Sequence, residues 1–368
     1  MTARLNAEVI GHRLEFDASQ REAALLLDAL SENLRAHSPT VLQRLRSRMP
    51  WFPVDSTQAP QRGLYLWGSV GRGKTLLMDM FFASLSLPQG ARGAERSHFY
   101  HFMRRVHAEL ATIKQHEEPL EVVAQRLASR TRVICLDEFF VADIADAMLL
   151  AGLFDGLFRR GVTLVTTSNV PPEGLYKDGL QRQRFLPAIE LIRTHVDVLH
   201  LDGGIDYRLR QLQQAPTYLD SNRADTPAAL RQTFAALAGG IASGPSTLSI
   251  EGRTLRTVDA GPGMVWFEFG ELCDGPRSQN DYIELARLYH TIFIANIPIF
   301  DRHNENAARR FIMAIDEFYD RGVTIVVSAA AAPAALYRGE RLQFEFERAA
   351  SRLIEMQTQE YLAGQHRP

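Results

Sequence analysis

The chain has 368 residues, of which 46% are hydrophobic and 23% are charged, as is ordinary for folded globular proteins. Its length indicates one large domain or two ordinary domains, with enough apolar residues to bury a sizeable core. The net charge of −2 provides no global attraction to nucleic acid, so binding of that kind would need a local basic patch.

The cysteines and the first residues bear on the cellular compartment. Cys135 and Cys273 form no CxxC pair, which favours a reducing compartment without a disulfide framework. The first ten residues contain no signal-peptide core, and Glu8, Glu15 and Asp17 disfavour an organelle transit peptide. The apolar runs are shorter than the ~18 residues of a membrane-spanning helix. We therefore expect a cytoplasmic protein whose membrane association, if any, is peripheral.

The first 50 residues have the pattern of an amphipathic helix. Asp17 is the expected N-cap, and Gln20 completes a capping box. Apolar residues between 23 and 34 then recur at helical spacing on one face. We expect this helix to pack on the domain that follows, with a coiled coil or a partner helix as the alternative. Residues 50–53, which contain two prolines, end the helical pattern.

From residue 64 to residue 201 the chain alternates between strand and helix. This alternation predicts an α/β fold with a parallel sheet and right-handed crossovers. Because ligands of such sheets bind at the carboxyl ends of the strands, the loops there are where a site is expected. The expected strands are 64–67, 97–101, 132–137, 162–167 and 196–201.

The loop after the first of these strands has the sequence of a phosphate-binding loop, the P-loop. Residues 68–75 read Gly-Ser-Val-Gly-Arg-Gly-Lys-Thr, which matches G-x-x-x-x-G-K-T between a strand and a helix. Its glycines allow positive φ and a close backbone approach to phosphates, and the following helix N-terminus adds positive charge. Lys74 is expected to contact the β- and γ-phosphates of ATP, and the Thr75 hydroxyl to bind Mg²⁺. The expected nucleotide-binding residues are Gly68, Ser69, Val70, Gly71, Arg72, Gly73, Lys74 and Thr75.

Polar side chains follow the third and fourth strands. The third strand ends in Asp137 and Glu138, a Walker B pattern in which Asp137 holds Mg²⁺ through water and Glu138 orients or polarises the attacking water. Two adjacent carboxylates at a strand end are costly without a nearby cation or donors, which supports a metal–phosphate site. Asn169 follows the fourth strand and is expected to contact the γ-phosphate or the water as sensor 1. The alternative is a loop asparagine before two prolines.

A basic segment that contains Arg182 and Arg184 precedes the fifth strand. In ring-forming ATPases an arginine at this edge reaches the γ-phosphate bound by the neighbouring subunit, a contribution of about 10³–10⁵ in rate. Arg184, directly before Phe185, is the first candidate and Arg182 the alternate. A solvated basic helix end is the competing explanation. The arginines therefore predict a homo-oligomer that assembles with ATP.

Other polar residues near these strands are given structural roles. Asp143 and Asp146 are expected at the N-cap and N3 positions of the following helix, although a catalytic role is the alternative. His98, His101 and His107 are expected to be buried or capping residues, because the spacing of the first two does not suit a metal site on one strand face.

The second half begins with a change in composition after residue 210. Residues 211–247 are polar and rich in alanine and glycine, with a helix expected from 227 to 238 and Thr226 as its cap. A hairpin is expected at 247–258, with its turn at Glu251-Gly252. Alternation then returns, with strands at 264–269, 291–296 and 323–328 and helices at 279–289 and 305–320. The expected domains are a helical segment at 1–60, a P-loop ATPase core at 61–210, a variable linker and helix at 211–247, and an α/β domain at 248–368.

The second half also carries a weak internal repeat. Residues 160–165 match residues 321–326, and Leu175-Tyr176 matches Leu336-Tyr337, at one offset of 161 residues. The second copy lacks Gly-Lys-Thr, which suggests a degenerate α/β unit that no longer binds nucleotide and serves as lid, partner surface or subunit contact. Chance similarity of two buried strands is the alternative.

The final helix of the chain offers two further arginines. Arg348 and Arg352 are candidates for a sensor 2 contact with the nucleotide.

Four segments of the chain resemble the ZapE cell-division ATPase family of AAA+ proteins. The resemblance extends from about residue 17 to residue 362, although 211–247 match it poorly. It implies Mg²⁺-dependent ATP hydrolysis that remodels a protein partner, the FtsZ ring, at the division site of a bacterial cell. The mitochondrial members of the family imply instead a role in handling or degrading membrane proteins. The four segments are residues 63–75, 136–148, 179–189 and 275–282.

Other classes of nucleotide-binding protein fit the sequence less well. The N-K-x-D motif of GTPases and the L-S-G-G-Q motif of transporter ATPases are absent from the sequence. No acceptor pocket of a small-molecule kinase is evident. A nucleic-acid loader or motor remains an alternative because similar cores serve DNA replication, although no strong nucleic-acid signal is present. A nucleotide-dependent scaffold without enzymatic activity also remains open.

Overall fold

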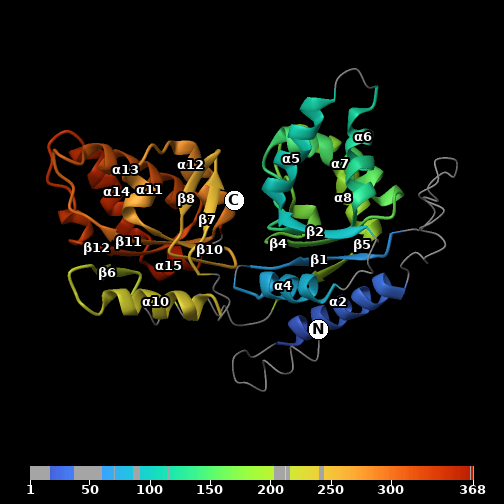
Figure 1. Cartoon of the computed structure of the whole chain (residues 1–368), viewed down its shortest axis with the longest axis horizontal. Coiled ribbons are helices and arrows are strands. Elements are labelled where there is room, and N and C mark those ends of the chain that lie inside the picture. Colours follow the sequence, from blue (N-terminus) through green and yellow to red (C-terminus); the bar gives the residue numbers. More distant parts are fainter. Residues whose placement is uncertain are drawn as a thin grey trace. The chain divides into compact units, whose positions relative to one another are not determined.

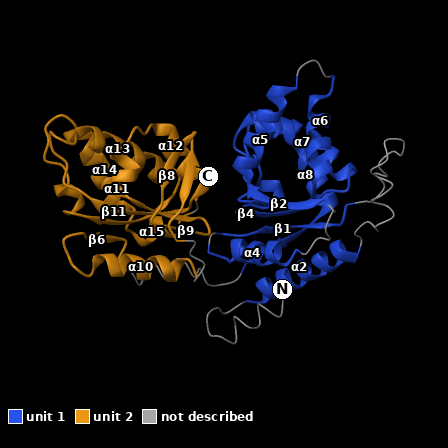
Figure 2. Cartoon of the chain, in the orientation of Figure 1, with its two compact units in different colours: residues 1–204 blue, residues 205–368 orange. Residues whose placement is uncertain are grey.

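The computed structural model divides into two compact units, residues 1–204 and 205–368, which Figures 1 and 2 show. Each unit is built around a five-stranded sheet of its own. Within the described residues, no helix is both long enough and apolar enough to cross a membrane. The structure describes residues 17–36, 60–69, 71–85, 92–113, 117–202, 212, 216–239, 244–364 and 366–367.

The first unit begins with helix α2 (Ala18–Ala36), whose capping box is confirmed. The backbone N–H of Gln20 donates to Asp17 Oδ1 at 2.8 Å, and the backbone N–H of Asp17 donates to Gln20 Oε1 at 3.1 Å. The apolar face of α2 packs against α4 (Lys74–Ser84), where Leu27 and Phe81 lie in one core cluster. The expectation that this helix packs on the following domain is therefore confirmed. The expected helix end at residues 50–53 lies outside the described residues.

The five strands of the first unit run parallel in the order β2-β3-β4-β1-β5. Four of them lie within one residue of the predicted bounds. Figure 1 shows α5, α6, α7 and α8 on one face of the sheet and α2 and α4 on the other. The strands are β1 (Gly63–Trp67), β2 (Gly93–His98), β3 (Thr131–Asp137), β4 (Thr163–Ser168) and β5 (Val196–His200). The helices after α4 are α5 (Phe99–Thr112), α6 (Pro119–Arg130), α7 (Ile144–Arg159) and α8 (Leu186–His195).

The second strand was expected at 97–101, and this expectation is wrong. The strand ends at His98, and helix α5 begins at Phe99. Strand β2 is an edge strand of mixed polar composition, so it lacks the apolar run that marks the central strands. The aromatic residues around 99 belong instead to the buried face of the helix, which consists of Phe99, Phe102, Met103 and Val106.

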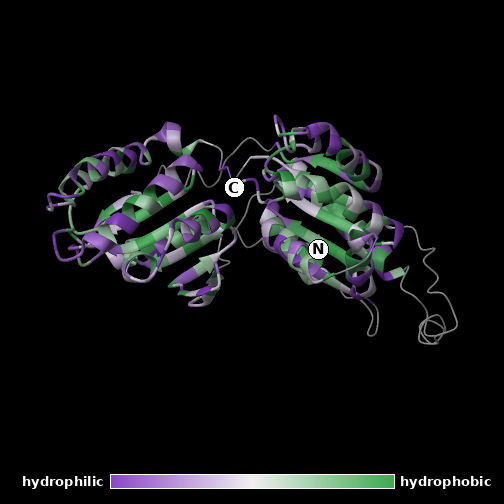
Figure 3. Ribbon diagram, turned by 90° about the horizontal axis from the view of Figure 1, so that it is seen from above, coloured by the Kyte–Doolittle hydropathy of each residue, from purple (hydrophilic) through white to green (hydrophobic). Residues whose placement is uncertain are grey.

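The second unit has the strand order β6-β12-β11-β10-β9, in which the first four strands are parallel and β9 is antiparallel. The predicted strands and helices after residue 264 are confirmed to within one residue. In Figure 3 the central strands of both units are hydrophobic. The strands are β6 (Tyr218–Asp220), β7 (Thr247–Ile250), β8 (Arg253–Arg256), β9 (Asp259–Gly261), β10 (Met264–Glu268), β11 (Thr291–Ile297) and β12 (Thr324–Ala329). The helices are α10 (Thr226–Leu237), α11 (Phe269–Cys273), α12 (Gln279–Leu288), α13 (Glu305–Asp320), α14 (Gln343–Glu355) and α15 (Gln359–Leu362).

Two local expectations for the second unit have different outcomes. The hairpin of β7 and β8 is confirmed, since Ile250 pairs with Arg253 across the predicted turn. Helix α10 begins one residue earlier than expected, so Asp225 rather than Thr226 occupies the N-cap position. The Thr226 hydroxyl donates to the carbonyl of Asp220 at 2.5 Å, which ties the helix start to the end of β6.

The internal repeat of the sequence corresponds to a repeat of the fold. Helix α13 and strand β12 occupy the positions of α7 and β4 at the offset of 161 residues, and so do the 3-10 turns Pro333–Ala335 and Pro172–Gly174. Strands β10, β11 and β12 pair in parallel, as a degenerate α/β copy of the first unit would.

The repeat extends further than the sequence indicated, because β6 and α10 take the places of β1 and α4. The Tyr65 hydroxyl donates to the carbonyl of Val170 at 2.9 Å, and the Tyr218 hydroxyl donates to the carbonyl of Ala331 at 2.6 Å. Residues 221–225 connect β6 to α10 where the first unit has the P-loop. The segment expected to be a linker thus supplies a strand and a helix of the second unit.

Candidate nucleotide-binding site

The strand order of the first unit places the predicted site residues at neighbouring strand ends. Strand β4 lies between β1 and β3, and Trp67 pairs with Ser168 at the carboxyl ends of β1 and β4. The P-loop, Asp137, Glu138 and Asn169 therefore all follow adjacent strands. Asn169 is half-buried at the central position among them.

The glycines of the P-loop are required by its backbone. Gly71 and Gly73 have φ of 82° and 74°, in the left-handed region that residues with a Cβ rarely adopt. At Gly68, with φ of 155°, a Cβ atom would lie 2.5 Å from the carbonyl oxygen of Leu201. Val70 lies outside the described residues. These glycines explain how the chain turns sharply enough to enter helix α4.

Lys74 is buried, with 9% of its surface exposed, and its ammonium curls back onto the P-loop. The Nζ atom donates to the carbonyl of Gly68 at 2.6 Å and to the carbonyl of Ser69 at 2.8 Å. The Arg72 side chain braces the same loop, since its Nε donates to Ser69 Oγ at 3.0 Å. Lys74 thus joins the start of helix α4 to the start of the loop through two hydrogen bonds to backbone carbonyls.

Asp137 has a cationic partner that the sequence reasoning missed. Only 5% of Asp137 is exposed, and Arg96 of β2 donates from Nε to its Oδ2 at 2.7 Å. Arg96 also pairs with Asp79 of α4. Burial lowers the pKa of Arg96, but hydrogen bonds and charge from Asp137 and Asp79 outweigh burial and raise it. The cation that a buried Asp-Glu pair needs is thus supplied in part by the protein itself.

A signal for these partners was present in the sequence. Arg96 stands inside a strand, and Asp79 stands inside the otherwise apolar start of helix α4. Charges within buried elements generally require partners of the opposite sign. Their pairing could not be assigned because residue 96 was expected to precede the strand rather than to lie within it.

Glu138 occupies a strained turn that is anchored to β4. Its φ is 52°, and its backbone N–H donates to Thr167 Oγ1 at 3.1 Å. The backbone N–H of Phe139 donates to the carbonyl of Thr167 at 2.7 Å. A non-glycine residue in this conformation costs of order 1 kcal/mol or more and is common at functional sites.

The carboxyl of Glu138 is buried, and its Oε2 has no hydrogen-bond partner among the described residues. The pKa of this carboxyl is raised to about 8, first by burial and then by the charge of Asp137, while the charge of Lys74 opposes both. A buried carboxyl with an unused oxygen and a pKa near neutrality is typical of a group that handles a proton.

The two candidate arginines lie in the 3-10 turn Arg182–Arg184 and have different surroundings. Arg182 is half-buried and donates from its guanidinium to the carbonyl of Glu173 at 2.6 Å. Arg184 is exposed, while the adjacent Phe185 is fully buried and anchors the turn in the core. The structure thus presents Arg184 to solvent and uses Arg182 to hold the turn.

The two acids at the start of α7 differ in role, since one caps the helix and the other contacts a histidine. Asp143 is the N-cap of α7, as expected, since its Oδ1 accepts from the backbone N–H of Ala145 at 2.6 Å. Asp146 lies at N3 and pairs with Nε2 of His107 at 2.7 Å. Burial lowers the pKa of His98. Burial, together with the charges of His98, Arg104 and Arg105, lowers the pKa of His101 to about 4.

Helix α14 holds the sensor 2 candidates in ion pairs of the second unit. Arg348 and Arg352 both donate to the Asp316 carboxylate, at 2.6 and 2.7 Å. Arg352 also lies over the ring of Tyr319, 4.6 Å from its centroid. Their role toward a nucleotide stays a prediction.

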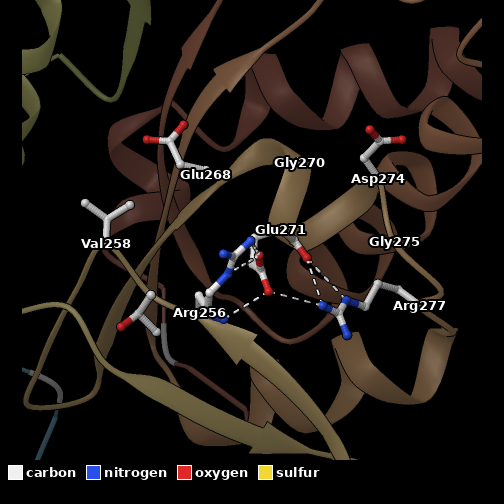
Figure 4. A pocket seen from close by; sticks show the side chains of 9 residues that line it. Arg256, Val258, Glu268, Gly270, Glu271, Asp274, Gly275 and Arg277 are labelled. Atoms are coloured by element: carbon white, nitrogen blue, oxygen red, sulfur yellow. Dashed lines mark hydrogen bonds and ion pairs between the residues drawn. The ribbon is translucent and has the colours of Figure 1, made fainter.

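A cavity of about 450 Å³ lies in the second unit, and three of the charged residues that line it are paired with one another. Figure 4 shows Glu271 between Arg256 and Arg277. The neighbouring residues of the segment 275–282 hold the β7–β8 hairpin in place, because the buried Asp281 pairs with Arg253 of β8. This part of the family resemblance thus has a structural role within the second unit.

Known proteins resemble this chain over most of its length. The model of the AFG1-like ATPase family matches residues 1–365. The Escherichia coli K12 protein named cell division protein ZapE is 50% identical over 355 residues, which cover 95% of this chain and 94% of that protein. Lactation elevated protein 1 homolog B of Danio rerio is 35% identical over 348 residues, which cover 82% and 68% of the two chains. The chain belongs to the AFG1-like ATPase family.

Proposed function

We propose that the chain hydrolyses ATP at the P-loop in a Mg²⁺-dependent reaction and couples hydrolysis to remodelling of a protein partner. The observation that carries this proposal is the position of the buried Glu138 carboxyl. Glu138 follows β3 and the P-loop follows β1, and these two strands flank β4. Membership of an ATPase family supports the same reaction.

The nucleotide is proposed to bind at the P-loop and at the start of α4. Lys74 would exchange its contacts with the loop carbonyls for the β- and γ-phosphates. The backbone N–H groups of the loop would face the same phosphates, aided by the partial positive charge of the helix N-terminus. Glycine at positions 71 and 73, where φ is positive, would let the backbone approach the phosphates closely.

The residues beside the loop fit a bound Mg²⁺. The Thr75 hydroxyl and the Asp137 carboxylate are hard oxygen donors, and Mg²⁺ is commonly held by one or two carboxylates together with water and phosphate oxygens. Arg96 approaches Asp137 Oδ2 at 2.7 Å but Oδ1 only at 3.4 Å, so Oδ1 is the less engaged oxygen. When bound, Mg²⁺ neutralises charge on the β- and γ-phosphates.

Glu138 and Asn169 are proposed to place the attacking water. The Glu138 carboxylate accepts the hydrogen bond of the water and orients its oxygen toward the γ-phosphate, while the Asn169 amide contacts the γ-phosphate or the same water. The left-handed turn at Glu138 directs its carboxyl by backbone geometry, because two hydrogen bonds fix residues 138 and 139 to Thr167.

Arg184 is proposed to complete the site of a neighbouring subunit. It is exposed, and its turn is flanked by Leu180 and Leu186, which are 71% and 41% exposed. Apolar side chains around an exposed cation are typical of a subunit contact. The chain would then act as an ATP-dependent homo-oligomer, with Arg182 as the alternate finger.

The partner is proposed to be an FtsZ-like protein of the bacterial division ring, with the chain recruited from the cytoplasm to the division site. This step rests on the 50% identity to a protein whose name assigns it to cell division.

The proposal is tested with Lys74→Ala and Glu138→Gln. The first variant should lose nucleotide binding, and the second should bind ATP without turning it over. Rapid ATP turnover by the second variant would contradict the role of Glu138. An ATPase assay with and without FtsZ, paired with sedimentation of its filaments, tests the partner. A salt-sensitive stimulation by DNA instead would favour a nucleic-acid motor.

A further inference from the structure

The capping box of α2 is joined directly to the P-loop by one side chain. Gln20 is buried, with 5% of its surface exposed, and its Nε2 donates to the carbonyl of Arg72 at 3.0 Å. The other end of the same amide, Oε1, accepts from the backbone N–H of Asp17. The two halves of the amide therefore have separate tasks, one in the cap and one at the loop.

The contact determines the direction of a peptide group that adjoins Lys74. In a trans peptide the C=O and N–H bonds point in opposite directions. Because the carbonyl of Arg72 is held toward Gln20, the N–H of Gly73 points away from α2. Gly73 is the N-cap residue of α4, so this N–H is among those that a helix start offers to an anion. A flip of this peptide would present a carbonyl oxygen to the phosphates instead.

The P-loop and Gln20 are also matched in shape. A Cβ atom added at Gly73 would lie 3.1 Å from Gln20 Nε2, which is tighter than ordinary contact. Glycine at 73 thus suits the positive φ of this position and leaves room for the close approach of the amide. The far end of α2 is fixed as well, since Arg35 donates to the carbonyl of Ser84 at the end of α4 at 2.8 Å.

We propose that Gln20 is a positioning residue for the nucleotide and that α2 braces the P-loop along helix α4. The amide holds the Arg72–Gly73 peptide in the orientation that directs its N–H toward the phosphates. This inference rests on the proposed function, in which the P-loop binds ATP. Because coupling between two sites is reciprocal, bound nucleotide in turn stabilises the docking of α2.

Two single substitutions separate the two tasks of the amide. Gln20→Glu keeps an oxygen for the N–H of Asp17 and suits the N3 position of a capping box, but it loses the donor to Arg72. Asp17→Ala is the matched control, because it removes the cap and leaves the Gln20 amide in place. Lys74→Ala serves as the binding-deficient reference.

The measurement is the Kd for a fluorescent ADP analogue, with a thermal melt of each variant. Gln20→Glu should weaken binding about tenfold, the loss expected when the hydrogen bond to the half-buried Arg72 carbonyl is replaced by repulsion. Asp17→Ala should lower the melting temperature and keep Kd within about twofold. Hydrogen exchange of the wild type should show that ADP protects residues 17–36.

Three results would overturn the inference. The first is a folded Gln20→Glu variant that binds ADP as tightly as the wild type. The second is an equal loss of affinity in Asp17→Ala, which would assign the effect to helix docking rather than to the amide. The third is unchanged exchange of α2 on addition of ADP, a readout that holds even where a variant fails to fold. A wild type that binds no nucleotide overturns the proposed function and this inference together, whereas the first three results leave the proposed function intact.

Discussion

Replacing Glu138 by glutamine should stabilise the nucleotide-free protein at alkaline pH and leave it unchanged at acidic pH. The native carboxyl has a pKa of about 8, while its ordinary value is 4.5. Between these two values the native state keeps a proton that the unfolded chain has lost. Because the native state then binds more protons, its stability falls as pH rises across this window, and the full penalty applies above pH 8.

The size of the effect follows from the same pKa values. Each pKa unit is worth about 1.4 kcal/mol, so the penalty above pH 8 amounts to roughly 3–5 kcal/mol. Glutamine has the shape of the protonated acid and carries no titrating group, so it removes the pH dependence. The left-handed backbone of residue 138 is strained for both side chains and cancels in the comparison.

The assay is urea unfolding of the wild type and of Glu138→Gln between pH 5 and pH 9, in EDTA and without nucleotide. Tryptophan fluorescence in a Trp266→Phe background reports on the first unit, because the remaining tryptophans lie within residues 1–204. Glu190→Gln is the control, since Glu190 is exposed on α8. A difference between wild type and Glu138→Gln that stays constant over this pH range would refute the buried, protonated carboxyl.

Three further predictions concern the pairing, assembly and stoichiometry of the site. Arg96→Ala should destabilise the metal-free protein by about 3 kcal/mol, because it leaves the Asp137 carboxylate buried and unpaired, and Mg²⁺ with ADP should recover part of the loss in a thermal melt. Arg184→Ala should reduce ATP turnover at concentrations where the wild type oligomerises; kinetics equal to those of wild type there would exclude the trans finger. Equilibrium dialysis should find one nucleotide per chain and none for Lys74→Ala, since the second unit lacks a P-loop; two per chain would contradict this.

Most strands and helices could be predicted because their patterns are local. The central strands are continuous apolar runs, and the P-loop and the capping box at Asp17 and Gln20 each depend on a few adjacent residues. The edge strand β2 was misplaced because its half-buried residues carry no apolar run. Strand β6 was missed for a similar reason, since three residues at a sheet edge are too few to show a period.

The partners of the site residues could not be predicted, because they come from distant parts of the chain. Arg96 reaches Asp137 from a neighbouring strand, and Gln20 reaches Arg72 across 52 residues of sequence. The sequence showed that two carboxylates at a strand end needed a cation, and it did not show that an arginine meets part of this need. Contacts of this kind follow from register and packing rather than from residue spacing.

Comparison of the two units distinguishes residues that maintain this fold from residues proposed to bind a nucleotide. The hydrogen bond from Gly68 N–H to the carbonyl of Ser168 has its counterpart between Ser221 and Ala329. These contacts persist in a unit without a P-loop, so they belong to the framework.

The acids of the first unit have no such counterpart. Strand pairing places His98 opposite Asp137 at the end of β2 and Glu268 opposite Ala295 at the end of β10, so alanine stands where the first unit has Asp137. Asn296, with φ of 62°, takes the place of Glu138, and its N–H donates to Ser328 Oγ as that of Glu138 donates to Thr167 Oγ1. The left-handed turn is therefore retained where the carboxylate is not. The backbone strain at residue 138 thus belongs to the fold, whereas the buried carboxyl there requires a chemical explanation.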